Sequence, residues 1–196
     1  IYVSNAGNLE ADNHDNNLYI NNGDLTFSEK AKEYNLATSG FSTHASFFDY
    51  DKDGDLDVYI LNNSNVPVSS LGNKGQRDKR AQDWENVDSD FRGVGDLLMR
   101  NDNGVFTDVS EEAGIYGSLI GFGLGVMVTD INQDLYPDIY ISNDFFERDY
   151  LYINNQDGTF TEEIKKWTSH LSLSAMGVDI SDINNDGLQD IFITDM

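Results

Sequence analysis

Two short units alternate along the chain, and their repetition constrains the fold more than any other feature of the sequence. The first unit is an apolar run, a turn rich in Asn, Asp and Gly, and then an aromatic residue; it occupies residues 17–27, 98–107 and 150–161. The second unit is an acidic loop between two apolar runs, at residues 47–60, 128–141 and 180–193. Apolar runs around such turns are typical of β-hairpins. The alternation therefore predicts an all-β fold built from repeats.

The spacing of the acidic loops predicts the size of each repeat. Asp130 and Asp182 occupy equivalent places and lie 52 residues apart, whereas Asp49 and Asp130 lie 81 residues apart. Four short strands in about 50 residues match one blade of a β-propeller, a radial four-stranded antiparallel sheet. The longer step indicates an insertion at residues 62–96. A β-sandwich is the alternative, but sandwiches seldom repeat their loops so closely.

The same alignment predicts where the blades begin and end. Residues 1–5 match residues 139–143, which leave an acidic loop, so we expect the chain to start just after one such loop and to end just after another. A ring needs about 4–8 blades, so we expect more of the propeller beyond both ends. Within one propeller domain we expect the end of a preceding blade and its connection at residues 1–16, an insertion at 62–96, and blades at 17–61, 97–143 and 144–196.

The acidic loops have the spacing of a cation site. The pattern Asp-x-Asp/Asn-x-Asp-Gly-x-x-Asp places side-chain oxygens at loop positions 1, 3, 5 and 9, and the residue at position 7 can add its backbone carbonyl. Carboxylates that converge in this way repel one another unless a cation lies between them. The candidate ligands are Asp49, Asp51, Asp53, Asp55 (carbonyl) and Asp57 in loop 1 (residues 49–57); Asp130, Asn132, Asp134, Tyr136 (carbonyl) and Asp138 in loop 2 (residues 130–138); and Asp182, Asn184, Asp186, Leu188 (carbonyl) and Asp190 in loop 3 (residues 182–190).

Calcium is the cation that these loops favour. The ligands are all oxygens, which suits calcium, and the chain has no cysteine to recruit a softer metal. The loops are not EF-hands, because the place of the bidentate Glu is taken by an isoleucine inside a strand: Ile60, Ile141 or Ile193. We therefore expect about three calcium sites, one in each loop.

Loop 2 departs from the pattern at one position. Leu135 stands where the other two loops have Gly54 and Gly187. If the backbone there takes a positive φ, a leucine costs roughly 1–2 kcal/mol. We therefore expect loop 2 to be the weakest of the three sites.

The charge balance excludes several classes of partner. The chain has 35 Asp and Glu against 12 Lys and Arg, a formal net charge of −23. Nucleic acids and anionic membranes attract positive surfaces, so the negative charge argues against both as partners. No segment approaches the ~20 apolar residues of a membrane span. Four basic residues lie close together in the predicted insertion: Lys74, Arg77, Lys79 and Arg80. This segment can dock an acidic partner or an anionic glycan, or be only a solvated loop.

No catalytic arrangement stands out in the sequence. The three histidines have no ligand spacing, and there is no Ser/His/Asp set or phosphate-binding Gly loop. Calcium accounts for the paired acids, so we expect a protein that is not an enzyme. Tyr59, Tyr140 and Phe192 share a register in the repeats, which favours packing within a blade over a sugar-stacking platform.

The chain resembles a known repeat family. Residues 121–125, 143–152 and 175–180, with the acidic loops, are similar to FG-GAP/VCBS repeats, familiar from the propellers of integrin α-chains. More narrowly, they resemble the bacterial proteins, similar to cartilage acidic protein, that couple such repeats to an ASPIC/UnbV domain. The resemblance implies a seven-bladed calcium propeller, of which this chain would be about half, used in adhesion or assembly and without a shared reaction.

These expectations combine into a function. Calcium would pin each hairpin within its blade, and millimolar extracellular or periplasmic calcium would fill such sites. We therefore expect an exported module for protein–protein interaction or assembly at the cell envelope or outside the cell. The alternative is a carbohydrate-active propeller, either a polysaccharide-binding protein or a polysaccharide lyase, whose partner would be a glycan.

Overall fold

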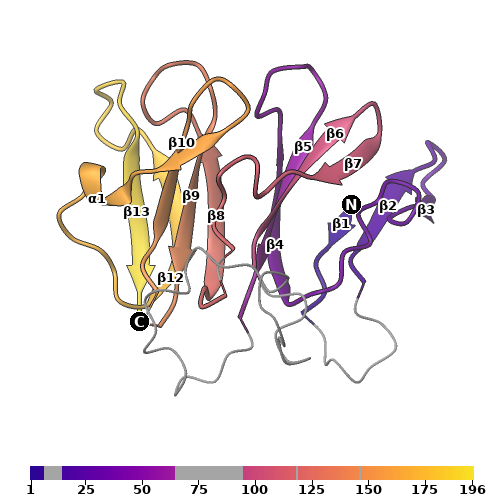
Figure 1. The fold of residues 1–196 in the computed structure, drawn as a ribbon, viewed down its shortest axis with the longest axis horizontal. Coiled ribbons are helices and arrows are strands. Elements are labelled where there is room, and N and C mark those ends of the chain that lie inside the picture. Colours follow the sequence, from indigo (N-terminus) through magenta and orange to yellow (C-terminus); the bar gives the residue numbers. More distant parts are fainter. Residues whose placement is uncertain (7–14, 65–94, 118, 146) are drawn as a thin grey trace.

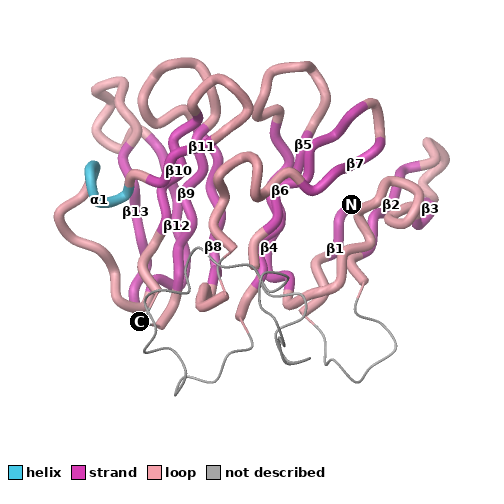
Figure 2. Tube along the Cα trace, viewed as in Figure 1, coloured by secondary structure: helices cyan, strands magenta, loops and turns pink. Residues whose placement is uncertain are grey.

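The computed structural model describes residues 1–6, 15–64, 95–117, 119–145 and 147–196. Most of the predicted insertion, and with it Lys74, Arg77, Lys79 and Arg80, lies outside these residues. The described chain consists of strands and loops apart from one short helix, α1 (Ile164–Trp167) (Figure 2). None of its helices has the length and apolar run needed to cross a bilayer.

Four antiparallel sheets stand side by side (Figure 1). Sheet 1 contains β1 (Tyr2–Val3), β2 (Asn17–Asn21) and β3 (Phe27–Glu29). Sheet 2 contains β4 (Ser42–Phe48), β5 (Asp57–Asn62), β6 (Leu97–Asp102) and β7 (Val105–Asp108). Sheet 3 contains β8 (Gly123–Thr129), β9 (Asp138–Asn143), β10 (Tyr150–Asn154) and β11 (Phe160–Glu162). Sheet 4 contains β12 (Ala175–Ser181) and β13 (Asp190–Asp195).

This arrangement confirms the predicted fold class, an all-β chain of propeller blades. In sheets 2 and 3 the strand order follows the chain, as in a four-stranded blade. The three acidic loops join the first and second strands of sheets 2, 3 and 4, and all three lie along one edge of the molecule, at the top of Figure 1. The repeats therefore place the candidate metal loops in a row.

The sheets group the strands differently from the predicted blade ranges. Strand β5, at the end of the predicted blade 17–61, pairs with β6 across the insertion, with Val58 opposite Met99 and Ile60 opposite Leu97. In sheets 2 and 3 the blade therefore begins with an acidic hairpin and ends with the Asn/Gly hairpin that follows it, half a repeat later than the ranges 17–61, 97–143 and 144–196 predict. The repeat period fixes the size of a blade, but only the pairing of strands fixes where it starts.

The core lies between the sheets. Apolar side chains of sheets 2 and 3 form one cluster, sheets 1 and 2 share a second, and sheets 3 and 4 share a third. Tyr59 and Tyr140 are fully buried, as predicted, but the equivalent Phe192 in β13 is 58% exposed. Sheets 2 and 3 approach each other closely at Gly123 of β8. A Cβ atom added to Gly123 would lie 2.2 Å from the Leu61 side chain of β5. A larger residue at position 123 would push sheets 2 and 3 apart.

A shared set of hydrogen bonds closes the connection between the second and third strands. In sheet 2, Asp96 accepts bonds from the Tyr59 hydroxyl (2.8 Å) and the Asn62 amide (3.0 Å). In sheet 3, Asp149 accepts the same bonds from Tyr140 (2.8 Å) and Asn143 (2.8 Å). The two ends of the predicted insertion therefore meet at the same geometry as the short connection in sheet 3. This explains how one blade accommodates an insertion without changing its sheet.

Candidate metal centre

The backbone of each acidic loop turns twice through the left-handed region. At position 4, Lys52, Gln133 and Asn185 have φ of 62°, 61° and 63°. At position 6, Gly54, Leu135 and Gly187 have φ of 97°, 74° and 87°. The positive φ expected at Leu135 is thus confirmed, with its strain of roughly 1–2 kcal/mol. These two turns wrap the chain around the carboxylates of the loop.

Backbone amides hold the carboxylates of loop 1 in place. The Gly54 amide donates to Asp49 Oδ2 (3.1 Å), and the Asp55 amide donates to Asp53 Oδ1 (2.8 Å). Oxygens of Asp49, Asp51 and Asp57 all lie within 4.8 Å of one another. The loop thus gathers three acidic groups where electrostatic repulsion opposes their approach.

Loop 1 passes a test of fit for a hard cation. Asp49 Oδ1 is buried and has no hydrogen-bond partner among the described residues. A buried carboxylate oxygen without a donor is costly, unless a cation supplies the missing interaction. The oxygen-only surroundings match calcium better than any softer metal. This Asp cluster can therefore hold a metal ion.

Asp57 is the most buried acid of loop 1 and stands at the start of β5. It is fully buried, and its two oxygens accept amide hydrogens from Tyr50 (3.0 Å) and Asn101 (2.8 Å). Burial is the main cause that raises the pKa of Asp57 to about 6, against the opposing effect of these two hydrogen bonds. Burial also raises the pKa of Asp51 and of Asp138, the equivalent of Asp57 in loop 2. A positive ion beside these groups would favour their charged forms.

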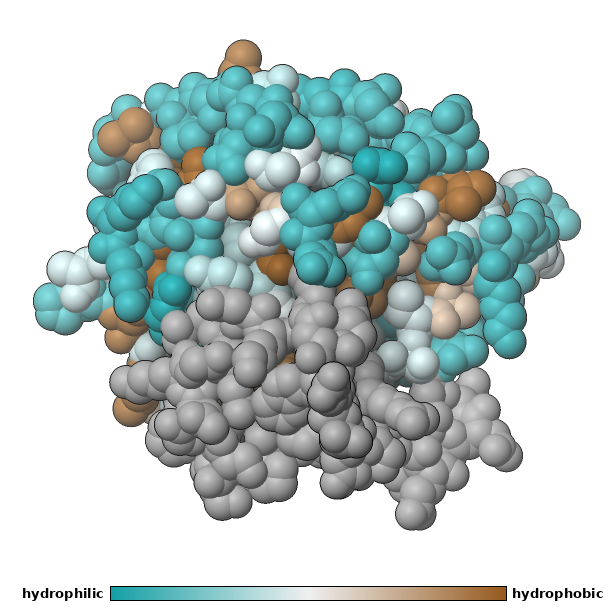
Figure 3. Space-filling model, in the orientation of Figure 1, coloured by the Kyte–Doolittle hydropathy of each residue, from teal (hydrophilic) through white to brown (hydrophobic). Residues whose placement is uncertain are grey.

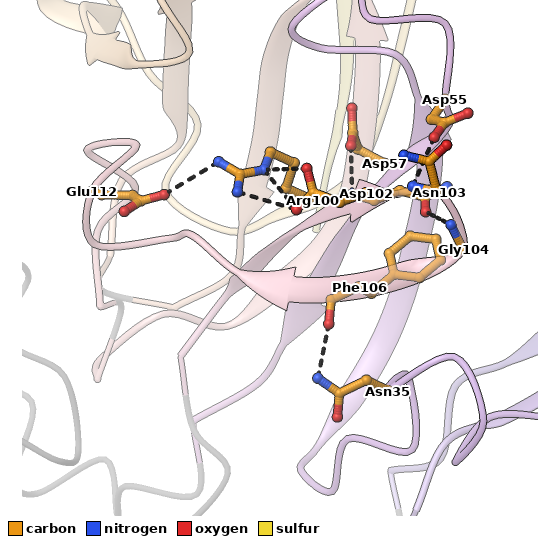
Figure 4. Close-up of polar contacts among 10 residues, drawn as sticks. Asn35, Asp55, Asp57, Arg100, Asp102, Asn103, Gly104, Phe106 and Glu112 are labelled. Atoms are coloured by element: carbon orange, nitrogen blue, oxygen red, sulfur yellow. Dashed lines mark hydrogen bonds and ion pairs between the residues drawn. The ribbon is translucent and has the colours of Figure 1, made fainter.

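Loop 1 also fixes the hairpin that follows it in the sheet (Figure 4). Asp57 Oδ1 accepts a hydrogen bond from the Asn101 backbone amide, and Asp55 Oδ2 accepts one from the Asn103 backbone amide (2.9 Å). The Asn101 side chain in turn donates to the Leu56 carbonyl (3.0 Å). The loop and the β6–β7 turn are thus held as one unit.

Loops 2 and 3 repeat the network of loop 1. In both, the amide at position 6 donates to the carboxylate at position 1 at 2.8 Å: Leu135 to Asp130 and Gly187 to Asp182. In both, the amide at position 2 donates to the carboxylate at position 9 at 2.9 Å. Position 3 is an asparagine, whose side chain donates to the position-5 carboxylate: Asn132 to Asp134 (2.9 Å) and Asn184 to Asp186 (3.0 Å). These loops therefore share the backbone path of loop 1 with one carboxylate fewer.

The structure identifies two site residues that the sequence left as turn residues. Asn101 and Asn154 occupy the same place in their hairpins, and each backbone amide donates to the position-9 aspartate of its own blade, Asp57 (2.8 Å) or Asp138 (2.9 Å). The recurrence of this asparagine in each Asn/Gly hairpin is the signal that could have found them. Position 9 is thus both a candidate ligand and the anchor of the next hairpin.

A polar cleft of about 370 Å³ lies beside loop 1, between sheets 2 and 3. Arg100 provides its positive charge and forms ion pairs with Asp102 (3.1 Å) and Glu112 (3.6 Å) (Figure 4). The other lining residues come from loop 1 and the β10–β11 hairpin: Tyr50, Asp51, Gln156, Asp157, Gly158 and Thr159. Hydroxyl, amide and charged groups thus line this cleft.

Comparison with solved structures gives a distant likeness. The structure of an Agrocybe aegerita lectin, described as recognising non-reducing terminal N-acetylglucosamine, matches with 16% sequence identity and a TM-score of 0.45. The match covers 92% of this chain and 42% of the lectin chain, so this chain spans less than half the length of that structure. A search of curated proteins found no match.

Comparison with protein-family models gives a clear result. The model described as FG-GAP-like repeat matches residues 2–60 and 130–193. These segments contain all three acidic loops and make up more than half of the chain. The narrower resemblance to ASPIC/UnbV-coupled proteins stays a prediction. The chain belongs to the FG-GAP-like repeat family.

Proposed function

We propose that this chain is a calcium-binding propeller module for protein–protein interaction or assembly, exported to the cell envelope or the extracellular space. The observation that carries the proposal is Asp49 Oδ1, which is buried and has no hydrogen-bond partner among the described residues. It lies with two further carboxylates in a loop whose hydrogen-bond network occurs three times. One calcium ion in each of the three loops would satisfy these oxygens.

Calcium would act on structure in this proposal. A bound ion would neutralise the loop carboxylates, which stand at positions 1, 3, 5 and 9 in loop 1 and at positions 1, 5 and 9 in loops 2 and 3. Because the position-9 aspartate also holds the following hairpin, filling a loop would stabilise the whole blade. Sites of this kind in extracellular modules bind calcium at about 10⁻⁴–10⁻³ M, which favours an exported protein over a cytosolic one.

The partner surface in this proposal includes the edge formed by the acidic loops. The face shown in Figure 3 is mainly hydrophilic along that edge. The formal net charge of −23 would repel other acidic proteins, and bound calcium would reduce that repulsion locally. A calcium-dependent partner is therefore the natural expectation. We propose no catalytic role, since ion binding accounts for the clustered acids.

Calorimetric titration tests the metal part of the proposal. Titration of the full-length protein with calcium, after chelator treatment, should show saturable binding, and Asp49→Asn should remove one equivalent of bound calcium. Glu33→Gln is the matched control, because Glu33 is an exposed acid paired with Lys30 outside the loops. Absence of calcium binding would overturn the metal part of the proposal.

The interaction part needs its own experiment. The intact protein would be used to capture material from envelope extract in calcium and again in chelator, with the bound proteins identified. We expect a protein partner that is retained in calcium, lost in chelator and lost with Asp49→Asn, but kept with Glu33→Gln. Equal capture under all conditions would contradict a calcium-dependent interaction.

The polar cleft beside loop 1 favours a second candidate, a carbohydrate-binding or polysaccharide-lyase propeller. Its residues offer hydroxyl, amide and carboxylate groups and one guanidinium, which suit sugar hydroxyls. The full-length protein should then bind immobilised polysaccharides, and Arg100→Ala should weaken that binding. Release of unsaturated sugars would distinguish a lyase from a binding protein, and absence of any glycan binding would exclude this candidate.

A further inference from the structure

Loop 1 contacts loop 2, and loop 2 contacts loop 3, through the side chain at position 4. The Lys52 ammonium of loop 1 lies 4.4 Å above the ring of Tyr136, which is position 7 of loop 2. The Gln133 side-chain amide of loop 2 donates to the carbonyl of Gly187, which is position 6 of loop 3 (2.5 Å). Both contacts run from position 4 of one loop to the position 6–7 segment of the next.

The left-handed backbone at position 4 makes these contacts possible. Lys52 and Gln133 have nearly the same φ, 62° and 61°, so the two side chains leave their loops in corresponding directions. Both residues lie between ligand positions 3 and 5. Closing a loop around an ion would therefore fix the side chain that reaches the neighbouring loop.

The contact from loop 2 to loop 3 ends on a peptide group that holds a candidate ligand. The Gly187 carbonyl and the Leu188 amide belong to one peptide group. Its carbonyl accepts the Gln133 hydrogen bond (2.5 Å), and its N–H donates to Asp186 Oδ1 at position 5 (2.8 Å). Hydrogen bonds on the two sides of a peptide group strengthen one another. An ordered Gln133 would thus help to hold Asp186 where an ion needs it.

Loops 1 and 2 are joined by a second, buried contact. The Asn154 side chain donates both to the Tyr50 carbonyl of loop 1 (2.9 Å) and to the Pro137 carbonyl of loop 2 (3.2 Å). The Asn154 backbone amide bonds Asp138 at position 9 of loop 2 (2.9 Å). This residue therefore spans the two loops, as Gln133 spans loops 2 and 3.

We propose that the acidic loops bind calcium as a coupled row, and that filling loop 2 raises the calcium affinity of loop 3 through the Gln133 side chain. This inference rests on the proposed calcium binding. Gln133 is a positioning residue: it touches no ion and acts through the peptide group that orients Asp186. Coupling between sites is reciprocal, so filling loop 3 also raises the affinity of loop 2.

The test follows each loop separately in the full-length protein. Hydrogen-exchange mass spectrometry at increasing free calcium gives a protection midpoint for peptides that cover residues 130–138 and residues 182–190. Disabling loop 2 with Asp130→Ala should raise the calcium midpoint of loop 3 by roughly fivefold, the lower end of typical coupling. Gln133→Met keeps the length of the side chain and every loop 2 ligand but removes the donor, and it should raise the loop 3 midpoint by a similar factor.

Two controls separate coupling from damage to a loop. Asn185→Ala removes the position-4 side chain of loop 3, which has no hydrogen bond to another loop within the described part of the chain, so it should leave the loop 2 midpoint unchanged. The double variant Asp130→Ala/Gln133→Met should shift the loop 3 midpoint no further than Asp130→Ala alone.

The outcomes distinguish this inference from the proposed function. If neither peptide gains protection at roughly 10 mM calcium, above the range of extracellular calcium modules, calcium binding by loops 2 and 3 itself fails, and the coupling fails with it. If both peptides gain protection but the loop 3 midpoint is the same in Gln133→Met and the unmodified protein, the coupling is wrong and the calcium sites stand. A shift confined to loop 3 in Gln133→Met supports the coupled row.

Discussion

Loops 1 and 2 follow the same path with different residues. Loop 1 has four candidate carboxylates and a glycine at position 6, whereas loop 2 has three carboxylates, Asn132 at position 3 and Leu135 at position 6. Even so, the position-6 amide reaches the position-1 carboxylate in both, at 3.1 Å in loop 1 and 2.8 Å in loop 2. The hydrogen bonds between carboxylates and amides thus set the shape of the loop. The remaining residues adjust its strain and its charge.

Removing calcium should have the largest effect and should separate the two loops. Each ion that binds only the folded state contributes about 2.7 kcal/mol when free calcium is about 100 times its Kd. We expect chelator to lower the melting temperature and to remove hydrogen-exchange protection from residues 49–57 more than from residues 130–138, because four carboxylates are left to repel one another in loop 1. Protection that is unchanged in both loops would contradict this difference.

The second prediction concerns the asparagine that links each loop to its hairpin. Asn154 is almost fully buried, and its side-chain amide donates to both the Tyr50 and the Pro137 carbonyl, whereas the more exposed Asn101 donates to the Leu56 carbonyl alone. The side-chain oxygen of each asparagine also accepts one backbone amide in its own turn. Asn154→Ala should therefore lower the free energy of unfolding by about 2 kcal/mol and Asn101→Ala by about 1 kcal/mol or less. Denaturant titrations in chelator measure both without a contribution from the ion. Equal losses would show that the two hairpins are held alike.

Much of this fold could be predicted because its signals are local. The spacing of the acidic positions predicts the turns, and the flanking apolar runs predict the strands. The phase of the blades could not be predicted, because Val58 pairs with Met99 across the insertion and no local pattern specifies that partner. The exposure of Phe192 was missed for a related reason: a repeat position shows which residues are equivalent but not what packs on each of them.

The candidate site divides in the same way. Asp49, Asp51 and Asp57 were predicted to converge, and the structure brings them together, because their positions within one tight loop determine their separation. The roles of Asn154 and Gln133 depend on how neighbouring sheets pack. Contacts between repeats are therefore the part of the site that the sequence did not reveal.

The third prediction exchanges the charge at position 3. In loop 2 the Asn132 side chain donates to Asp134 Oδ2 (2.9 Å), so Asn132→Asp would place two carboxylates together and give loop 2 the charge of loop 1. We expect the calcium affinity of loop 2 to rise about tenfold, ~1.4 kcal/mol, and the stability of the metal-free protein to fall. Asp51→Asn should do the reverse in loop 1. Calorimetric titration measures the affinities, and an unaltered affinity in both variants would show that position 3 is not a ligand.

The smallest effect should come from position 6, where the two loops differ only in strain. Leu135 is 76% exposed at φ 74°, and a Cβ added to Gly54 at φ 97° would have no atom within 4 Å, so substitutions at both places test the backbone with little change in packing. Leu135→Gly relieves about 1–2 kcal/mol of strain but loses about 0.5–1 kcal/mol to the greater freedom of glycine in the unfolded chain, so a gain of about 0.5–1 kcal/mol is expected. Gly54→Leu should destabilise the protein by a similar amount for the opposite reason. Denaturant midpoints in chelator and in calcium measure both changes. If Leu135→Gly gives no gain in stability while Gly54→Leu is destabilising, loop 2 has relieved its strain elsewhere. Leu135 would then not weaken loop 2 as a calcium site.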